Sequence, residues 1–285
     1  MQERILIVNG DDFGASETIN RAILKAHCEG ILTSASLLVG GRAFNQAVAI
    51  AQAHPRLSVG IHISLVRDRA TLPHPDIPQL TDCQGRLPHN PVRAGLRFFF
   101  INALKAQLTR EMENQIKKFL AAGLTPSHLD GHLNMQMHPT VLSILLKLAF
   151  KYSIPAIRLS REELRINLRL DRSHIVNKIL HAFIYHLLGC YAEKKMHKQG
   201  LFYPDHFFGL LNSGRINTDY LLGVLDHLKP GVTEIGLHPA LETPRELVKW
   251  AAAYKYREEL AALISPRVKA KINKLGIRLA NFRLE

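Results

Sequence analysis

The stretch that decides the fold is Val8-Asn9-Gly10-Asp11-Asp12-Phe13-Gly14. The apolar run over residues 5–8 predicts a buried strand, which ends at two adjacent carboxylates set between glycines. Adjacent carboxylates in a dry place repel each other, so one must be protonated or both must share a cation. Burying the pair without a partner is strongly unfavourable. A bound metal ion is the simplest remedy, and the other ligands are to be sought elsewhere in the chain.

The first third of the chain alternates strands and helices. We expect a helix capped by Ser16 that runs to about Glu29 and stops at Gly30, and a second helix over residues 43–53. Strands are expected over residues 5–8, 34–39 and 57–65. Strand–helix–strand units at this spacing indicate a parallel sheet.

The remaining chain continues the alternation with two interruptions. We expect helices over residues 109–122 (capped by Thr109), 140–151, 218–228, 244–263 and 266–275, and strands over 128–130, 156–159, 233–237 and 278–282. Residues 66–102 are proline-rich and irregular, which favours either a core-packing plug or a substrate-covering wall. Residues 161–200 are basic and helical. We predict one α/β domain over residues 1–285, a distorted β/α barrel of seven strands.

Composition limits the class of protein. Cys28, Cys83 and Cys190 have no CxxC spacing, so they indicate neither a disulfide framework nor a zinc ribbon and suit a reducing compartment. The first strand begins by about residue 4, so no signal peptide is expected. The net charge of +13 is compatible with an anionic partner, but no zinc finger, RNP-type motif or basic coiled coil is present, so nucleic-acid binding is not expected.

The apolar stretch over residues 179–192 is too short to span a bilayer, which needs about 20 residues. It lies in a segment, residues 174–197, that has an apolar face and flanking lysines. Two interpretations stay open for this segment. It is either a solvated basic helix or an interfacial helix that approaches lipid.

Ionisable side chains follow four of the expected strands. Asp11 and Asp12 end the first, and His62 lies near the end of the strand over residues 57–65. His128, Asp130 and His132 surround the strand over residues 128–130, and His238 follows the strand over residues 233–237. Because the C-terminal ends of parallel strands converge on one face, we expect these side chains to meet there.

The residue types in this set indicate metal-assisted amide hydrolysis. One carboxylate and two neutral imidazoles can hold a divalent ion and leave a position for water. The ion lowers the pKa of that water and polarises a carbonyl, while a second carboxylate takes the proton and a histidine protonates the leaving nitrogen. Structural roles stay open beside these, since Asp11 or Asp12 can cap a helix and His62 can be a core histidine. His128 and Asp130 are expected to support the site rather than bind the ion.

Four segments, in order, resemble the YdjC/ChbG-like carbohydrate deacetylase family. They are Val8–Gly14, Gly60-Ile61-His62, His128-Leu129-Asp130-Gly131-His132 and Glu234-Ile235-Gly236-Leu237-His238-Pro239. The resemblance covers nearly the whole chain and implies a β/α barrel related to the polysaccharide deacetylases. It implies one divalent ion, zinc or magnesium, held by Asp12, His62 and His132. It also implies Asp11 as the general base, His238 as the general acid, and Arg158 as the residue that orients Asp11 or the substrate.

The family usually carries further histidines after His132, where this chain has Asn134 and Gln136. We expect this departure to affect metal affinity rather than mechanism, because His132 itself is retained.

Two segments outside the metal motifs, residues 91–100 and 204–209, resemble the hopanoid-biosynthesis-associated (HpnK-like) branch of that family. This resemblance implies removal of an acetyl group from an N-acetylglucosaminyl hopanoid, with His206 and Phe207 near the substrate. A soluble chito-oligosaccharide is the alternative substrate. The expected location is the cytoplasm, with peripheral contact at the inner face of the membrane and a homodimer left open.

Two functions of other classes fit parts of the sequence. A non-haem iron oxygenase fits the spacing of His128 and Asp130 with a distant histidine, but that site is typical of all-β barrels rather than of an alternating chain. A non-catalytic basic protein at a membrane surface fits the charge. The intact set of Asp11, Asp12, His62, His132 and His238 argues against it.

Overall fold

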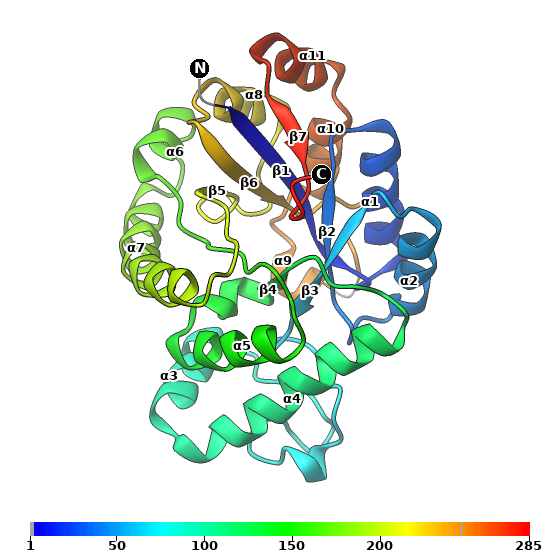
Figure 1. Ribbon diagram of the computed structural model, residues 1–285, viewed down its shortest axis with the longest axis vertical. Coiled ribbons are helices and arrows are strands. Elements are labelled where there is room, and N and C mark those ends of the chain that lie inside the picture. Colours follow the sequence, from blue (N-terminus) through cyan, green and yellow to red (C-terminus); the bar gives the residue numbers. More distant parts are fainter. Residues whose placement is uncertain (1–2, 246) are drawn as a thin grey trace.

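A computed structural model describes residues 3–245 and 247–285 (Figure 1). Its centre is a seven-stranded parallel sheet of order β4-β3-β2-β1-β6-β5, with β7 also paired to β1. The strands are β1 (Arg4–Phe13), β2 (Ser34–Leu37), β3 (Ser58–Ile63), β4 (Leu129–Gly131), β5 (His206–Phe208), β6 (Gly231–Leu237) and β7 (Arg278–Ala280). The predicted α/β class with a curled parallel sheet is confirmed.

Strand β1 is the axis of the sheet. Its ten residues are buried from Leu6 onward, as expected for a strand that is covered on both faces. It pairs with β6 over residues 4–10, with β7 over residues 5–7 and with β2 at residues 9, 10 and 13. Because β7 and β2 pair with opposite ends of β1, the sheet splays and curls around this strand, and the carboxyl end of β1 lies at the middle of the curve.

One of the seven strands differs from the sequence prediction. Residues 156–159 form only isolated bridges, from Ile157 to Leu129 and from Ala156 to Phe202, and no strand. The unexpected strand is β5, which pairs with β6. A strand of three residues is too short to show an alternating pattern in the sequence, so β5 was not predicted. The bridges nevertheless join β4 to the segment before β5, so they draw the two edges of the curled sheet together.

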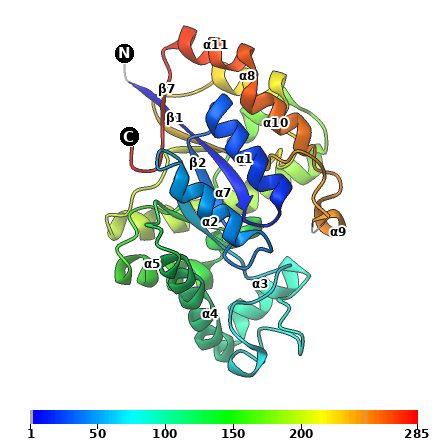
Figure 2. The ribbon, with the colours of Figure 1, turned by 90° about the vertical axis from the view of Figure 1, so that its right-hand side faces the viewer.

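The helices surround this sheet (Figures 1 and 2). Their bounds are α1 (Glu17–Glu29), α2 (Phe44–Ala53), α3 (Pro91–Phe100), α4 (Asn102–Ala121), α5 (Pro139–Lys151), α6 (Leu164–Leu170), α7 (Ile175–Lys198), α8 (Thr218–Asp226), α9 (Val248–Ala251), α10 (Tyr256–Ile264) and α11 (Pro266–Leu275), with 3-10 turns η1 (His74–Asp76) and η2 (His132–Met137). The predicted cap of α1 is confirmed, because the Ser16 hydroxyl accepts a hydrogen bond from the backbone N–H of Ile19.

Three helix predictions were wrong in their bounds. Helix α4 begins at Asn102, seven residues before the predicted cap. Thr109 therefore lies inside the helix, where its hydroxyl donates to the Lys105 carbonyl. Residues 91–100 form α3, capped by Asn90, within the segment expected to be irregular. The helix expected over residues 244–263 is split into α9 and α10. In the described part of the chain, no helix is long and apolar enough to cross a membrane.

Candidate metal centre and active site

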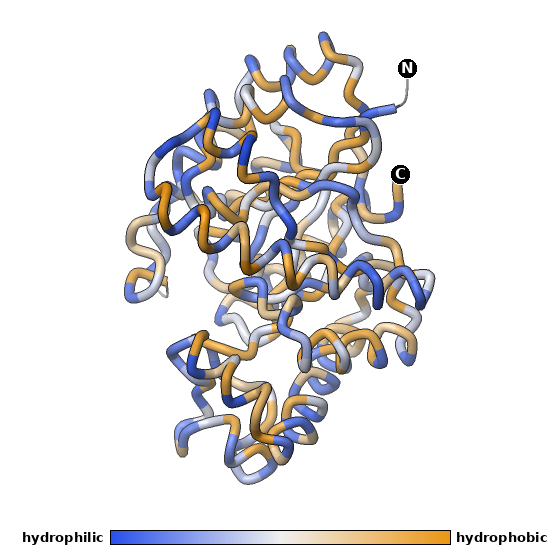
Figure 3. The backbone as a smooth tube through the Cα atoms, turned by 90° about the vertical axis from the view of Figure 1, so that its left-hand side faces the viewer, coloured by the Kyte–Doolittle hydropathy of each residue, from blue (hydrophilic) through white to orange (hydrophobic). Residues whose placement is uncertain are grey.

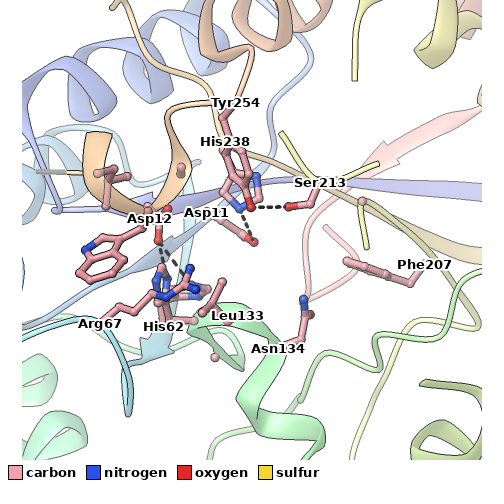
Figure 4. A pocket seen from close by; sticks show the side chains of 16 residues that line it. Asp11, Asp12, His62, Arg67, Leu133, Asn134, Phe207, Ser213, His238 and Tyr254 are labelled. Carbon is pink, nitrogen blue, oxygen red and sulfur yellow. Dashed lines mark hydrogen bonds and ion pairs between the residues drawn. The ribbon is translucent and has the colours of Figure 1, made fainter. Parts of the chain in front are cut away.

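The predicted site residues come together at the carboxyl ends of the strands. Asp11 and Asp12 lie near the end of β1, His62 lies in β3, His132 begins η2 directly after β4, and His238 follows β6. All five line one pocket, which is small and partly open to solvent (Figure 4). The other lining residues are Arg67, Gly131, Leu133, Asn134, Phe207, Gly209, Ser213, Leu247, Trp250, Ala251 and Tyr254.

Asp12, His62 and His132 form a group that could hold a metal ion. Asp12 Oδ1 lies 3.0 Å from His132 Nδ1 and 3.7 Å from His62 Nε2. One potential ligand atom from each residue lies within 4.8 Å of the others. Burial alone would raise the pKa of Asp12, but His132 and the other nearby histidines hold it well below its ordinary value. The charged carboxylate and two imidazoles are a donor set that suits a divalent ion, zinc above all.

The backbone at Asp12 separates the two adjacent carboxylates. Asp12 has a φ of 62°, in the left-handed region that aspartate adopts more readily than most residues. The Asp12 side chain faces His62 and His132, while Asp11 faces Arg158 and His238. The repulsive pair in the sequence is therefore resolved into two carboxylates with different partners.

A buried carboxylate orients His62. Asp130 Oδ1 lies 2.8 Å from His62 Nδ1, so the opposite nitrogen, Nε2, faces Asp12. Burial alone would lower the pKa of His62, but Asp130, Asp11 and Asp12 raise it to about 9. A carboxylate behind a ligating histidine fixes the ring and raises its basicity, as is common in metal sites.

Arg158 joins three buried carboxylates. Its Nη2 lies 2.8 Å from Asp11 Oδ1, its Nη1 lies 2.7 Å from Asp130 Oδ2, and its Nε lies 2.7 Å from Glu234 Oε1. Asp11, His62 and Asp130 form a second group that could hold a metal. The Arg158 guanidinium already satisfies both carboxylates of that group, which leaves the Asp12 group as the better candidate.

Glu234 is the third of the buried carboxyl groups around Arg158. Burial raises its pKa to about 8, against the opposing effect of Arg158. Its Oε2 has no hydrogen-bond partner among the described residues. One guanidinium cannot neutralise three carboxylates, so we assign the proton at neutral pH to Glu234. The sequence motif contains this residue, but no role was predicted for it.

Asp11 and His238 face each other across the pocket. The side-chain amide of Asn9 donates to Asp11 Oδ1 at 2.7 Å, and Asp11 Oδ2 lies 3.8 Å from His238 Nε2. Burial alone would raise the pKa of Asp11, but Arg158, His62 and His238 hold it well below its ordinary value. The His238 backbone N–H donates to Glu259, a buried carboxylate that also accepts from the Ile216 N–H at 3.0 Å.

The remaining predicted residues lie at different depths. His128 is fully buried outside the pocket, stacked on Phe282 with 3.7 Å between ring centroids, and burial lowers its pKa to about 3. His128 belongs to neither group of described residues that could hold a metal. The metal site of a non-haem iron oxygenase, which the spacing of His128 and Asp130 allowed, therefore has no counterpart among the described residues. Phe207 lines the pocket with Arg158 5.3 Å from its ring centroid, whereas His206 lies 3.8 Å from Glu163 and does not line it.

Asn134 and Gln136, which replace histidines common in the family, both bind Ser160. The Ser160 hydroxyl donates to Asn134 Oδ1 at 2.5 Å, and the Gln136 amide donates to the same hydroxyl at 2.9 Å. Asn134 reaches the pocket wall, while Gln136 is fully buried. Asp12, His62 and His132 form their group without a side chain from either position, so these two replacements leave the three candidate ligands intact.

Sequence reasoning missed the aromatic wall of the pocket. Trp250 stacks on His89 with 4.9 Å between ring centroids, and the Arg67 guanidinium lies 5.3 Å from the Trp250 ring. Tyr254 packs edge-on against His238, and its hydroxyl lies 2.9 Å from that of Ser213. Trp250 is the single tryptophan of the chain. This single tryptophan is the one feature of the sequence that could have pointed to the wall, because aromatic residues often mark a binding site.

Comparisons with known proteins show the family to which the chain belongs. The profile of the family described as YdjC-like protein matches residues 5–274. A carbohydrate deacetylase from Geobacillus stearothermophilus is 31% identical over 98% of this chain and 97% of its own length. A chitooligosaccharide deacetylase from Yersinia pestis is 28% identical over 98% of both chains. A crystal structure of an Enterococcus faecalis protein, to which cellobiose-phosphate cleavage has been ascribed, has a TM-score of 0.76 at 26% identity and covers 99% of this chain and 98% of that one. The chain therefore belongs to the YdjC-like family.

Proposed function

We propose that this chain is a metal-dependent carbohydrate N-deacetylase, which hydrolyses the acetamide of an N-acetylated amino sugar to acetate and a free amine. The observation that carries the proposal is the group of buried Asp12, buried His62 and half-buried His132 beside the facing pair of Asp11 and His238 in one pocket. Two full-length relatives are named as deacetylases of carbohydrates or chito-oligosaccharides, which supports the same reaction here.

Asp12, His62 and His132 would hold one divalent ion, zinc or magnesium. Bound there, the ion would polarise the acetyl carbonyl and lower the pKa of the attacking water. Two imidazole nitrogens are ligands that zinc accepts readily, whereas magnesium prefers oxygen. Asp130 positions His62, because its hydrogen bond to Nδ1 leaves Nε2 facing the group.

The other two residues move protons. Asp11, held ionised by Arg158 and oriented by Asn9, accepts the proton of the attacking water. His238 donates a proton to the departing sugar nitrogen, which leaves poorly as an anion. Arg158 positions Asp11 through two hydrogen bonds of 2.8 and 2.9 Å rather than touching the reacting atoms.

For the substrate we propose a lipid-linked N-acetylglucosamine of the hopanoid class, handled in the cytoplasm or at the inner face of the membrane. The similarity of residues 91–100 and 204–209 to the hopanoid-associated branch supports this choice, and Phe207 from the second segment contributes to the pocket wall. A soluble chito-oligosaccharide is the alternative.

Acetate release tests the proposal. The purified chain is incubated with N-acetylglucosaminyl bacteriohopanetetrol or with N,N′-diacetylchitobiose, with and without a chelator, and then with added zinc or magnesium. We expect acetate from the lipid-linked sugar, its loss with the chelator and its return with one of the two ions. Acetate from chitobiose alone would support the alternative substrate. No acetate from either, under any ion, would overturn the deacetylase proposal.

A further inference from the structure

Helix α7 presents an apolar face to solvent. Seven large apolar side chains of its first half are between 41% and 74% exposed. They are Ile175, Val176, Ile179, Leu180, Phe183, Ile184 and Leu187. Their spacing of three, four and one residues places them on one side of the helix. The opposite side packs on the protein through Lys178, Gly189, Ala192 and Met196.

Two neighbouring helices also expose large apolar side chains. Helix α5 packs against both α3 and α7, and Figure 1 shows α3 and α7 on the same side of the molecule. Phe100 of α3 is 72% exposed, and Phe150 of α5 is 85% exposed. Figure 3 looks at this side, and hydrophobic segments recur along the helices that face the viewer. We call the exposed side chains of these three helices the α3–α5–α7 face.

The charge of this face is mostly positive. About one residue in twelve of the chain is acidic, yet α3 and α5 hold no aspartate or glutamate and α7 holds one, Glu193. Glu193 is already paired with Arg161 at 2.7 Å. Basic residues are present in all three helices and include Arg93, Arg97, Lys147, Lys194 and Lys198. A large apolar surface bordered mostly by positive charge is unusual for a protein surface that stays in water.

This combination fits an anionic lipid surface better than it fits a second copy of the chain. Two copies meeting through this face would bring lysines and arginines together with Glu193 as their one acidic residue, and Glu193 is already paired with Arg161. Like charges across an interface are unfavourable. Anionic headgroups supply the missing negative charge, and the acyl boundary accepts the apolar side chains. We propose that the α3–α5–α7 face docks this protein on an anionic bilayer.

The face lies close to the pocket. Helix α7 contacts η2, which begins with His132 and contributes Asn134 to the pocket wall, and His138 at the start of α5 contacts Phe98 and Phe99 of α3. Docking would therefore hold the pocket beside the headgroup region. That placement deepens the proposed lipid-linked substrate, although the docking itself needs no reaction at the site.

Vesicle flotation tests the docking. The full chain is mixed with vesicles of phosphatidylcholine, or of equal parts phosphatidylcholine and phosphatidylglycerol, at low and high salt. We expect binding to the anionic vesicles that weakens at high salt, because salt screens the lysines and arginines. The triple variant Val176→Gln, Leu180→Gln, Phe183→Gln should bind at least tenfold more weakly, since it loses three exposed apolar side chains and no packing contact of the core.

The control variant carries Leu241→Gln and Leu284→Gln, which are exposed apolar residues outside the face, and should bind like the wild type. Circular dichroism checks that all variants are folded. Wild-type protein that does not float with anionic vesicles, or a triple variant that floats as well as the wild type, would overturn the proposal. A dimer in analytical ultracentrifugation that the triple variant dissociates would assign the face to a second copy and also overturn it.

Two further readings separate this inference from the proposed reaction. Flotation of the Asp11→Asn variant should equal that of the wild type, because Asp11 lies in the pocket. The triple variant should retain wild-type acetate release from any water-soluble substrate. Vesicle binding without acetate release would therefore contradict the reaction and leave the docking supported.

Discussion

Arg158 offers the sharpest test of how the site is built. It is 1% exposed and bridges Asp11, Asp130 and Glu234, all of them buried. Replacing Arg158 by methionine keeps much of its volume but leaves ionised carboxylates without their counter-charge. Removing one partner of a buried ion pair typically destabilises a protein by about 3–5 kcal/mol. The melting temperature should fall by about 6–20 °C at 2–4 °C per kcal/mol.

Urea denaturation followed by circular dichroism measures the free energy of unfolding of Arg158→Met. Arg158→Lys is the matched control, because it keeps one positive charge and loses only the fork of donors, so it should destabilise less than Arg158→Met. An unfolding free energy of Arg158→Met within about 1 kcal/mol of the wild type would refute the reasoning. It would mean that the three carboxyl groups do not depend on this guanidinium.

Four further perturbations follow from the geometry. Glu234→Gln should flatten the pH dependence of stability: burial raises the pKa of Glu234 from 4.5 to about 8, so the folded state keeps a proton that the unfolded state releases. The wild type should therefore lose stability relative to the variant as pH rises from about 4.5 to 8, which urea titrations at the two limits measure. Asp130→Asn should weaken metal binding by about 10–100-fold in a chelator competition, since it removes the carboxylate behind His62; unchanged affinity would contradict its positioning role. Gly60→Ala should lower the melting temperature, because the added Cβ would lie 2.3 Å from the His128 ring. Gly95→Ala is the matched control: its Cβ would lie 3.5 Å from the His138 ring, an ordinary contact, so the melting temperature should be unchanged or higher. Trp250→Ala should raise KM several-fold with little change in kcat, because the ring lines the pocket but is assigned no part in metal binding or proton transfer. A loss confined to kcat would argue against a substrate wall.

The sequence carried the strong features of the fold. The run at residues 5–8 predicted β1 because a short run of four consecutive apolar residues is typical of a strand covered on both faces. The convergence of Asp11, Asp12, His62, His132 and His238 followed from the rule that parallel strands end on one face. In the structure all five line one pocket, as that rule leads one to expect.

Short and tertiary features were beyond the reach of the sequence. Strand β5 has three residues and exists because β6 offers it an edge, so no local pattern marks it. The break between α9 and α10 places Tyr254 against His238, and the Lys255 N–H bonds to the Gly214 carbonyl there. That contact joins segments about 40 residues apart. The different roles of Asp11, Asp130 and Glu234 around Arg158 likewise depend on distances that only the folded chain defines.

The separation of Asp11 from Asp12 is the central claim, and one paired measurement tests it most directly. The metal content and the rate of acetate release are measured for Asp11→Asn and Asp12→Asn purified side by side. We predict that Asp11→Asn keeps one bound ion per chain and loses about 10²–10⁴-fold in turnover, as expected for removal of a general base. Asp12→Asn should lose the ion itself. An Asp12→Asn protein that keeps its ion, or an Asp11→Asn protein that turns over at the wild-type rate, would contradict the account.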